Sequence, residues 1–310
     1  MIKSITGCLL LAIVAFPARG IWPELPLVAP GLVKAGLVEE NKPSSAEANS
    51  ENPCTNVALT QGLKYGDSDQ NLLDVATSVD KSATPRPVLL FVAGSSFADE
   101  RTPADWTTRQ HAACLAARSG MVGVTMAYRR APDHSWPAGA QDVAAAISWI
   151  HQNIDLFGGD RRAIVAIGFD VGAFHLASFL AHREFQAADS DLAGAILVSG
   201  IYRSDAEAGE GERSYLGADA SQYDERSAFP GILTVEEPIV LAWSAVDAPR
   251  LVAQAESLKQ RLCEAGHCPR TALLTSRDSP SSVFGLDGAG DSLAERLRQL
   301  LDQIEMRGLP

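Results

Sequence analysis

A glycine-bounded segment, Gly168-Phe-Asp-Val-Gly172, holds the residue whose type and position are best suited to chemistry. It follows an apolar run at 163–167 and opens a second apolar stretch at 171–181. This pattern predicts a tight turn from a strand into a helix, because glycine tolerates the crowded backbone that such a turn requires. The turn would present Asp170 at the place where acyl-transfer enzymes carry a serine nucleophile.

The elements that must position this turn alternate along the chain. Short apolar runs predict strands buried on both faces, at 88–92, 121–127, 163–167, 195–198, 239–243 and 271–275. Apolar residues three or four apart predict helices at 103–119, 143–154, 171–181, 250–263 and 293–304. The alternation predicts an α/β fold, with a mostly parallel central sheet covered by helices on both faces.

Ligands of such a sheet bind beyond the carboxyl ends of its strands. The segments expected there are 93–97, 168–172, 244–247 and 276–282. They contain acids and serines, and no histidine follows His267 in the chain. His175 falls within the predicted helix after the turn, where packing is a commoner role for histidine than catalysis.

Several longer segments resemble those of the α/β-hydrolase superfamily, in its carboxylesterase and hormone-sensitive-lipase-like branch. They are Leu73-Asp-Val75, Tyr128 to Asp142, Phe157-Gly-Gly-Asp160, Ser214-Tyr-Leu-Gly217 and Ala242 to Asp247. The resemblance covers roughly residues 55–303 and implies the α/β-hydrolase fold. Active members carry a triad in the chain order serine, acid, histidine.

The resemblance assigns the triad-equivalent positions of this chain one at a time. The serine position holds Asp170, the acid position retains Asp247, and the histidine position holds Ser279. These three residues are predicted to lie together at the carboxyl edge of the sheet, with Ser95 nearby. With Asp170 at the serine position and Ser279 at the histidine position, both the nucleophile and the base of the triad are replaced, and the triad needs both.

The oxyanion loop of the family, rich in glycine, corresponds here to Ala93-Gly-Ser-Ser-Phe97. Oxyanion donors are backbone N–H groups, so those of Ser95 and Val171 could still serve. The changes to Ser95 and Ser96 restrict the backbone and add side chains where an acyl group would lie.

Three functional interpretations follow from these replacements. In the first, the chain keeps the fold and has lost hydrolysis, because the loss of two triad members leaves little beyond binding. In the second, Asp170 is the nucleophile of an active hydrolase that acts on esters or related small molecules, as aspartate is in some enzymes of this fold. In the third, a different site uses Ser95, Ser96 or Ser199.

The formal net charge of −12 argues against nucleic acid or an anionic membrane as a partner, since little positive charge is available for phosphates. No cofactor is expected, and the cysteines lack the spacing of a zinc site. An ester-like small molecule is a possible ligand. The oligomeric state is left open.

The first twenty residues read as a signal peptide, with Lys3, an apolar stretch at 7–16 and the small-residue site Ala18-Arg-Gly20. Residues 21–53 read as a linker or N-terminal extension, and 54–310 as the hydrolase domain. The expected protein is therefore exported, to the periplasm or beyond. Export permits disulfides, and a Cys263–Cys268 bridge is predicted across a short turn. Cys54 and Cys114 could pair or stay free.

Overall fold

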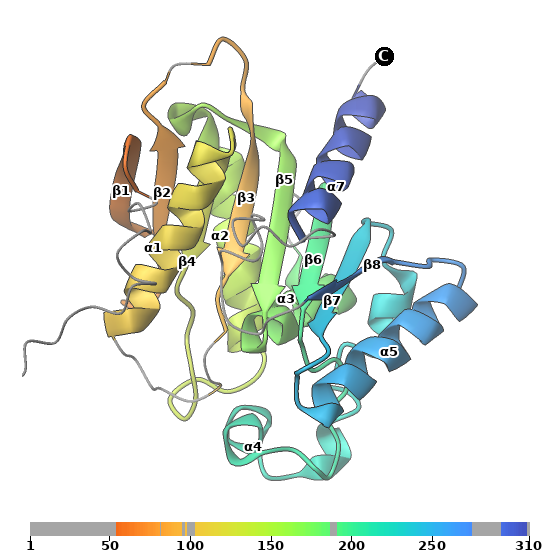
Figure 1. The fold of residues 1–310 in the computed structure, drawn as a ribbon. Helices are drawn as coiled ribbons and strands as arrows, with labels where there is room; N and C mark the ends of the chain where they lie inside the picture. The colour runs from red at the N-terminus through yellow and green to blue at the C-terminus, as the bar shows by residue number, and fades with distance from the viewer. Residues whose placement is uncertain are drawn as a thin grey trace, which may run out of the picture. The chain divides into compact units, whose positions relative to one another are not determined.

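An eight-stranded sheet organises the residues that the computed structural model describes, in the order β1-β2-β4-β3-β5-β6-β7-β8 (Figure 1). The described residues are 54–80, 82–94, 97, 103–186, 191–274 and 293–308, and they belong to one compact unit. The proposed signal peptide and extension, 1–53, lie outside them. The strands are β1 Val57–Lys64, β2 Leu72–Ser78, β3 Arg86–Val92, β4 Val122–Met126, β5 Gly159–Phe169, β6 Gly194–Val198, β7 Ile239–Ser244 and β8 Arg270–Leu274.

The predicted parallel sheet is confirmed from β4 onward, since β3 pairs in parallel with β4 and β5, and β5 to β8 follow in parallel. β1 and β2 pair antiparallel, and β2 joins the rest by an antiparallel pairing with β4. The sequence reading did not predict this antiparallel hairpin. β1 lies at the edge and is largely exposed, so its sequence lacks the continuous apolar run of the central strands.

Helices cover both faces of the sheet. They are α1 Pro103–Arg118, α2 Ala138–Asn153, α3 Val171–Ala181, α4 Glu210–Leu216, α5 Pro249–Glu264 and α7 Leu293–Gly308, with short 3-10 turns at η3 Ile154–Phe157, η4 Arg183–Phe185, η5 Ala220–Gln222 and η6 Gly231–Thr234. Alternate residues of β3 enter two separate cores. One core includes side chains of α2, α3 and α5, and the other includes side chains of α1 and α7.

Helix boundaries follow the local signals. α1 begins at Pro103, as predicted from the preference of proline for the first helical position. Gly120, beyond its end, has a φ of +84°, which favours glycine. α2 begins at Ala138, five residues before the predicted start, because its small first residues carry no apolar periodicity.

The family-like segment from Tyr128 to Asp142 forms a packed connection between β4 and α2. Asp142 is only 2% exposed, and its carboxylate accepts hydrogen bonds from the Arg129 backbone N–H (2.7 Å) and Nε (2.9 Å). The hydrogen bond with Asp142, and its negative charge, raise the pKa of the Arg129 guanidinium. This buried pair ties the chain after β4 to α2, so these two residues have a role in the fold.

Two disulfides occur in the described residues. Cys263 and Cys268 are bonded across the turn after α5, as predicted. Cys54 is bonded to Cys114, which ties the chain before β1 to α1 and settles a pairing that the sequence left open.

Candidate active site

Asp170 lies at the tip of a strained turn between β5 and α3. Its backbone has φ +49° and ψ −114°, a left-handed conformation that a non-glycine residue rarely adopts. Its N–H donates to the Val198 carbonyl at 2.9 Å, and its carbonyl accepts from the Phe174 N–H at 3.1 Å. The half-buried Asp170 carboxylate makes no capping hydrogen bond to α3. These two backbone hydrogen bonds help to hold the turn.

Glycines allow the backbone around this turn to pack closely. A Cβ atom on Gly172 would lie 2.0 Å from the Val92 carbonyl oxygen at the end of β3. A Cβ atom on Gly94 would lie 1.9 Å from the Phe169 carbonyl oxygen and 2.8 Å from the Val171 nitrogen. All three distances are below 3.0 Å, a separation that Cβ atoms essentially never show. Gly94, shortly after the end of β3, therefore lies against the turn.

Asp247 follows β7 and is 7% exposed. Its Oδ2 accepts hydrogen bonds from the Ser199 hydroxyl at 2.7 Å and the Ser244 backbone N–H at 2.8 Å. Ser199 itself follows β6 and has a positive φ of +50°. Since β5, β6 and β7 are neighbours, Asp170, Ser199 and Asp247 stand at the same edge of the sheet.

The remaining sequence-predicted residues fall into two groups. Val171 is buried as the first residue of α3, where its N–H belongs to the unpaired first turn of the helix. Ser95, Ser96 and Ser279 lie outside the described residues. The grouping of Ser279 and Ser95 with Asp170 and Asp247 therefore stays a prediction.

His175 is enclosed behind the turn, as its mid-helix position predicted. Its side chain is 1% exposed, with the rings of Tyr128 and Tyr215 at centroid distances of 4.6 and 5.0 Å. Burial, and secondly the charge of Arg130, lower the pKa of His175 from 6.5 to about 3. This histidine is neutral at physiological pH and packs in the core.

Several other histidines make local contacts. His267 lies before β8, in a hollow with the residues that precede β7, and so opposite the carboxyl edge, as predicted. His182 contacts the Ser227 carbonyl oxygen at 3.1 Å, and His151 contacts the Asp191 carbonyl oxygen at 2.9 Å. His134 donates its backbone N–H to the Arg130 carbonyl within the connection after β4.

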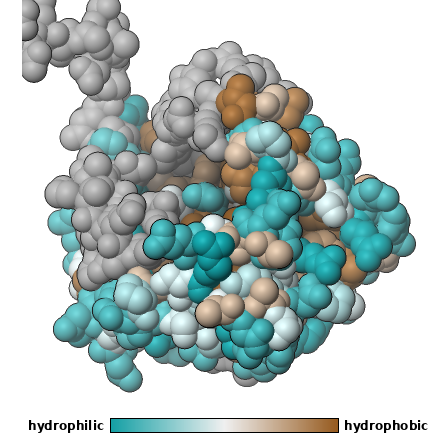
Figure 2. Space-filling model, turned by 90° about the horizontal axis from the view of Figure 1, so that it is seen from below, coloured by the Kyte–Doolittle hydropathy of each residue, from teal (hydrophilic) through white to brown (hydrophobic). Residues whose placement is uncertain are grey.

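The wider surface at this edge is polar. Seen from below, the side on which α4 lies, hydrophilic residues cover most of the described face and hydrophobic residues gather in smaller areas (Figure 2). Among the described residues, no group of three His, Cys, Asp or Glu side chains could hold a metal ion. No helix within the described ranges has the length and hydropathy needed to cross a membrane.

Comparison with known proteins identifies the relatives of this chain. The family model BD-FAE matches residues 73–197. Esterase LipC of Mycobacterium tuberculosis is 39% identical over 115 residues, which are 37% of this chain and 27% of LipC. Esterase LipQ of the same organism is 32% identical over 161 residues, which are 47% of this chain and 36% of LipQ.

The solved structures add the evidence of fold. An inhibited esterase B from Lactobacillus rhamnosis, bound to a tributyrin phosphonate, superimposes with a TM-score of 0.68 at 15% identity, covering 84% of this chain and 90% of that one. The chain has the α/β-hydrolase fold, and its sequence is similar to the carboxylesterase and hormone-sensitive-lipase-like branch of that superfamily. It spans only about a third of the length of the LipC and LipQ relatives.

The sequence predicted the turn at Asp170 but missed the contact between Ser199 and Asp247. Forty-eight positions separate the two residues, and only the adjacency of β6 and β7 brings them together. The available signal was weak: a serine directly after one strand and an acid shortly after the next.

Proposed function

We propose that this carboxylesterase-like protein has lost ester hydrolysis by a serine triad and acts by binding. The supporting observation is Asp170 at the tip of the β5–α3 turn, where the fold would present a nucleophilic serine. The proposal takes Ser279 as the residue at the histidine position. With both changes, neither the attacking hydroxyl nor its base is in place.

The chemistry of a carboxylate supports this proposal. Attack of Asp170 on an ester would form an anhydride, and release of the acyl group would then require a water activated by a base. The retained acid, Asp247, already accepts hydrogen bonds from Ser199 and Ser244. His175 is buried among aromatic rings and cannot reach a substrate from there.

A second candidate function keeps Asp170 as a working nucleophile. The strained backbone of the turn is intact, and strain of this kind is often retained at functional sites. A carboxylate can displace halide from an alkyl halide or open an epoxide, forming an ester that water must cleave. The second step again requires a base, and this requirement makes hydrolysis the weaker candidate.

An esterase assay on the purified protein decides between these functions. With short-chain aryl esters we expect no turnover above that of Asp170→Ala. The double variant Asp170→Ser, Ser279→His should give only weak rescue, because Ser95, Ser96 and Pro280 alter the surroundings of the restored groups. Turnover at ordinary esterase rates that disappears in Asp170→Ala would make Asp170 the nucleophile and refute the proposal.

We further propose that the protein is exported, after removal of residues 1–20. The disulfides Cys54–Cys114 and Cys263–Cys268 support this location, because such bonds persist mainly in oxidising compartments. Cell fractionation with mass spectrometry of the non-reduced protein tests it. An intact N-terminus with free, alkylatable thiols in the native host would contradict it.

A further inference from the structure

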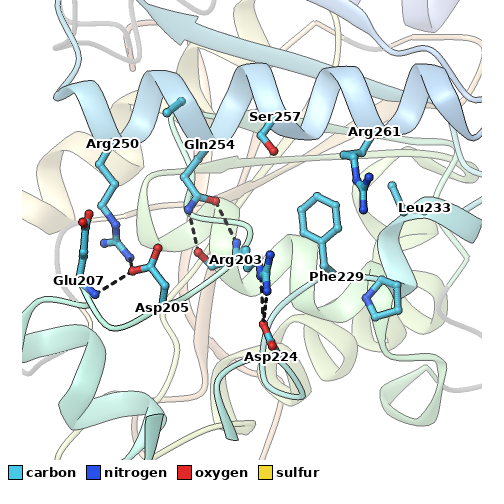
Figure 3. A pocket seen from close by; sticks show the side chains of 12 residues that line it. Arg203, Asp205, Glu207, Asp224, Phe229, Leu233, Arg250, Gln254, Ser257 and Arg261 are labelled. Carbon is cyan, nitrogen blue, oxygen red and sulfur yellow. Dashed lines mark hydrogen bonds and ion pairs between the residues drawn. The ribbon is translucent and has the colours of Figure 1, made fainter. Parts of the chain in front are cut away.

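A groove of about 850 Å³ runs along α5, outside the elements that hold Asp170 and Asp247. One wall is a single face of α5, with Arg250, Gln254, Ser257 and Arg261 at helical spacing (Figure 3). The other wall is the segment 203–233. The volume is in the range of protein ligand sites.

The wall opposite α5 is fixed by hydrogen bonds. The side-chain oxygen of Gln254 accepts hydrogen bonds from the backbone N–H groups of Tyr202 and Arg203, each at 3.0 Å. Its side-chain nitrogen donates a hydrogen bond to the Arg203 carbonyl at 2.7 Å. The Arg203 guanidinium pairs with Asp224 at 2.9 Å. Because these contacts join both walls, the groove is a formed feature of the fold.

One end of the groove carries surplus negative charge. Arg250 forms a double hydrogen bond with Glu212, which is 3% exposed, so its charge is already balanced within the protein. Asp205 lies 3.5 Å from Arg250, and Glu207 lies beside Asp205 (Figure 3). This end therefore attracts a cation.

The middle and the other end differ in character. Phe229, Pro230 and Leu233 supply an apolar floor, with the phenyl ring facing α5 (Figure 3). Arg261 stands beyond them, and its contact with Glu264 at 3.6 Å joins two side chains that are more than half exposed. An ion pair of that kind contributes little, so Arg261 can engage an anion.

The spacing of the two ends sets the length of a ligand. Arg250 and Arg261 are eleven positions apart on α5, which corresponds to about 16 Å along the helix. An extended chain covers about 3.4 Å per residue, so two residues four positions apart lie about 14 Å apart, and their long side chains cover the remaining distance. A ligand that fills the groove must carry a cation at the acidic end, an apolar group over Phe229 and an anion at Arg261.

We propose that this groove binds an extended segment of a partner protein that carries a basic residue and an acidic residue about four positions apart. The basic residue lies at Asp205 and Glu207, an apolar side chain lies on Phe229, and the acidic residue lies at Arg261. The inference extends the binding role proposed above, and it stands whether or not Asp170 turns over esters.

Calorimetric titration with end-capped pentapeptides tests the proposal. Acetyl-Lys-Ala-Phe-Ala-Glu-amide should bind with a Kd below about 1 mM, and acetyl-Phe-Lys-Glu-Ala-Ala-amide, of equal composition with adjacent charges, should bind about tenfold more weakly. Arg261→Glu should weaken the first peptide about tenfold and improve binding of acetyl-Lys-Ala-Phe-Ala-Lys-amide.

The matched control is Lys259→Glu, which makes the same charge change on α5 without altering a groove residue. It should leave binding of every peptide unchanged. Absence of binding at millimolar peptide would overturn the proposal, as would equal loss in the Lys259 and Arg261 variants. Asp170→Ala separates the two proposals, because it affects ester turnover if there is any and leaves peptide binding unaltered.

Discussion

Two regions of this α/β-hydrolase-fold protein differ: the packed interior behind the β5–α3 turn, and the side chains at its tip. Behind the turn, Gly172 lies against β3, His175 packs among tyrosines and Asp142 binds Arg129. At the tip, Asp170 occupies the strained turn before α3, and Ser199 binds Asp247.

Under the proposed function, this difference explains how the fold persists without ester hydrolysis. The interior motifs are required for the chain to fold, so a protein without catalysis still needs them. The side chains at the tip are partly exposed or bonded to each other, and their identity changes the chemistry more than the stability. A family resemblance carried by interior segments therefore reports the fold.

The largest effect is expected from a change in the interior. Gly172→Ala places a methyl group 2.0 Å from the Val92 carbonyl oxygen, so α3 must shift away from β3. We expect a loss of about 3 kcal/mol or more in the free energy of unfolding. Gly209→Ala is the control, since a Cβ atom there meets nothing within 4 Å. Equal midpoints in urea for the two variants would show that the close approach is unnecessary.

His175 makes the interior sensitive to acid. Its pKa is lowered from 6.5 to about 3 in the folded state, so the unfolded chain takes up the proton first. Stability should therefore fall as pH decreases from about 6.5 toward 3, by up to about 1.4 kcal/mol per pH unit from this group. His175→Gln should remove that part of the slope. Parallel loss of stability in both proteins between pH 6.5 and 4 would contradict the assignment.

These interior features show how much the sequence could predict. The bounds of α3 and the turn before it were predictable, because glycine spacing and apolar periodicity are local signals. The Cys263–Cys268 bond was predictable for the same reason, and Cys54–Cys114 was not, since 60 positions separate its cysteines. The groove along α5 depends on side chains that only the folded chain brings together.

A smaller effect is expected at the edge, from Ser199→Ala. The buried Asp247 carboxylate would lose the hydroxyl donor at 2.7 Å and keep the Ser244 N–H. We expect a loss of about 1.5 kcal/mol, the usual range for a hydrogen bond to a charged group. Ser178→Ala is the matched control, because that buried hydroxyl has no hydrogen-bond partner among the described residues. The Ser178 variant should match the parent protein in chemical denaturation.

The smallest effect is expected at the tip itself, where two contributions of opposite sign meet. Asp170→Gly relieves the positive φ of +49°, which stabilises by about 1 kcal/mol. It also removes a negative charge from the N-terminus of α3, which costs about 0.5 kcal/mol. The net change should be a gain of about 0.5 kcal/mol.

Asp170→Asn separates these two contributions, because it removes the charge and keeps the strained side chain. It should destabilise by about 0.5 kcal/mol, and high salt should reduce the difference by screening the charge. If both variants instead lost 2 kcal/mol or more, Asp170 would be part of the packed interior. Packing would then determine which residue the fold accepts at position 170. The aspartate there would be explained by stability and not by the loss of a catalytic serine.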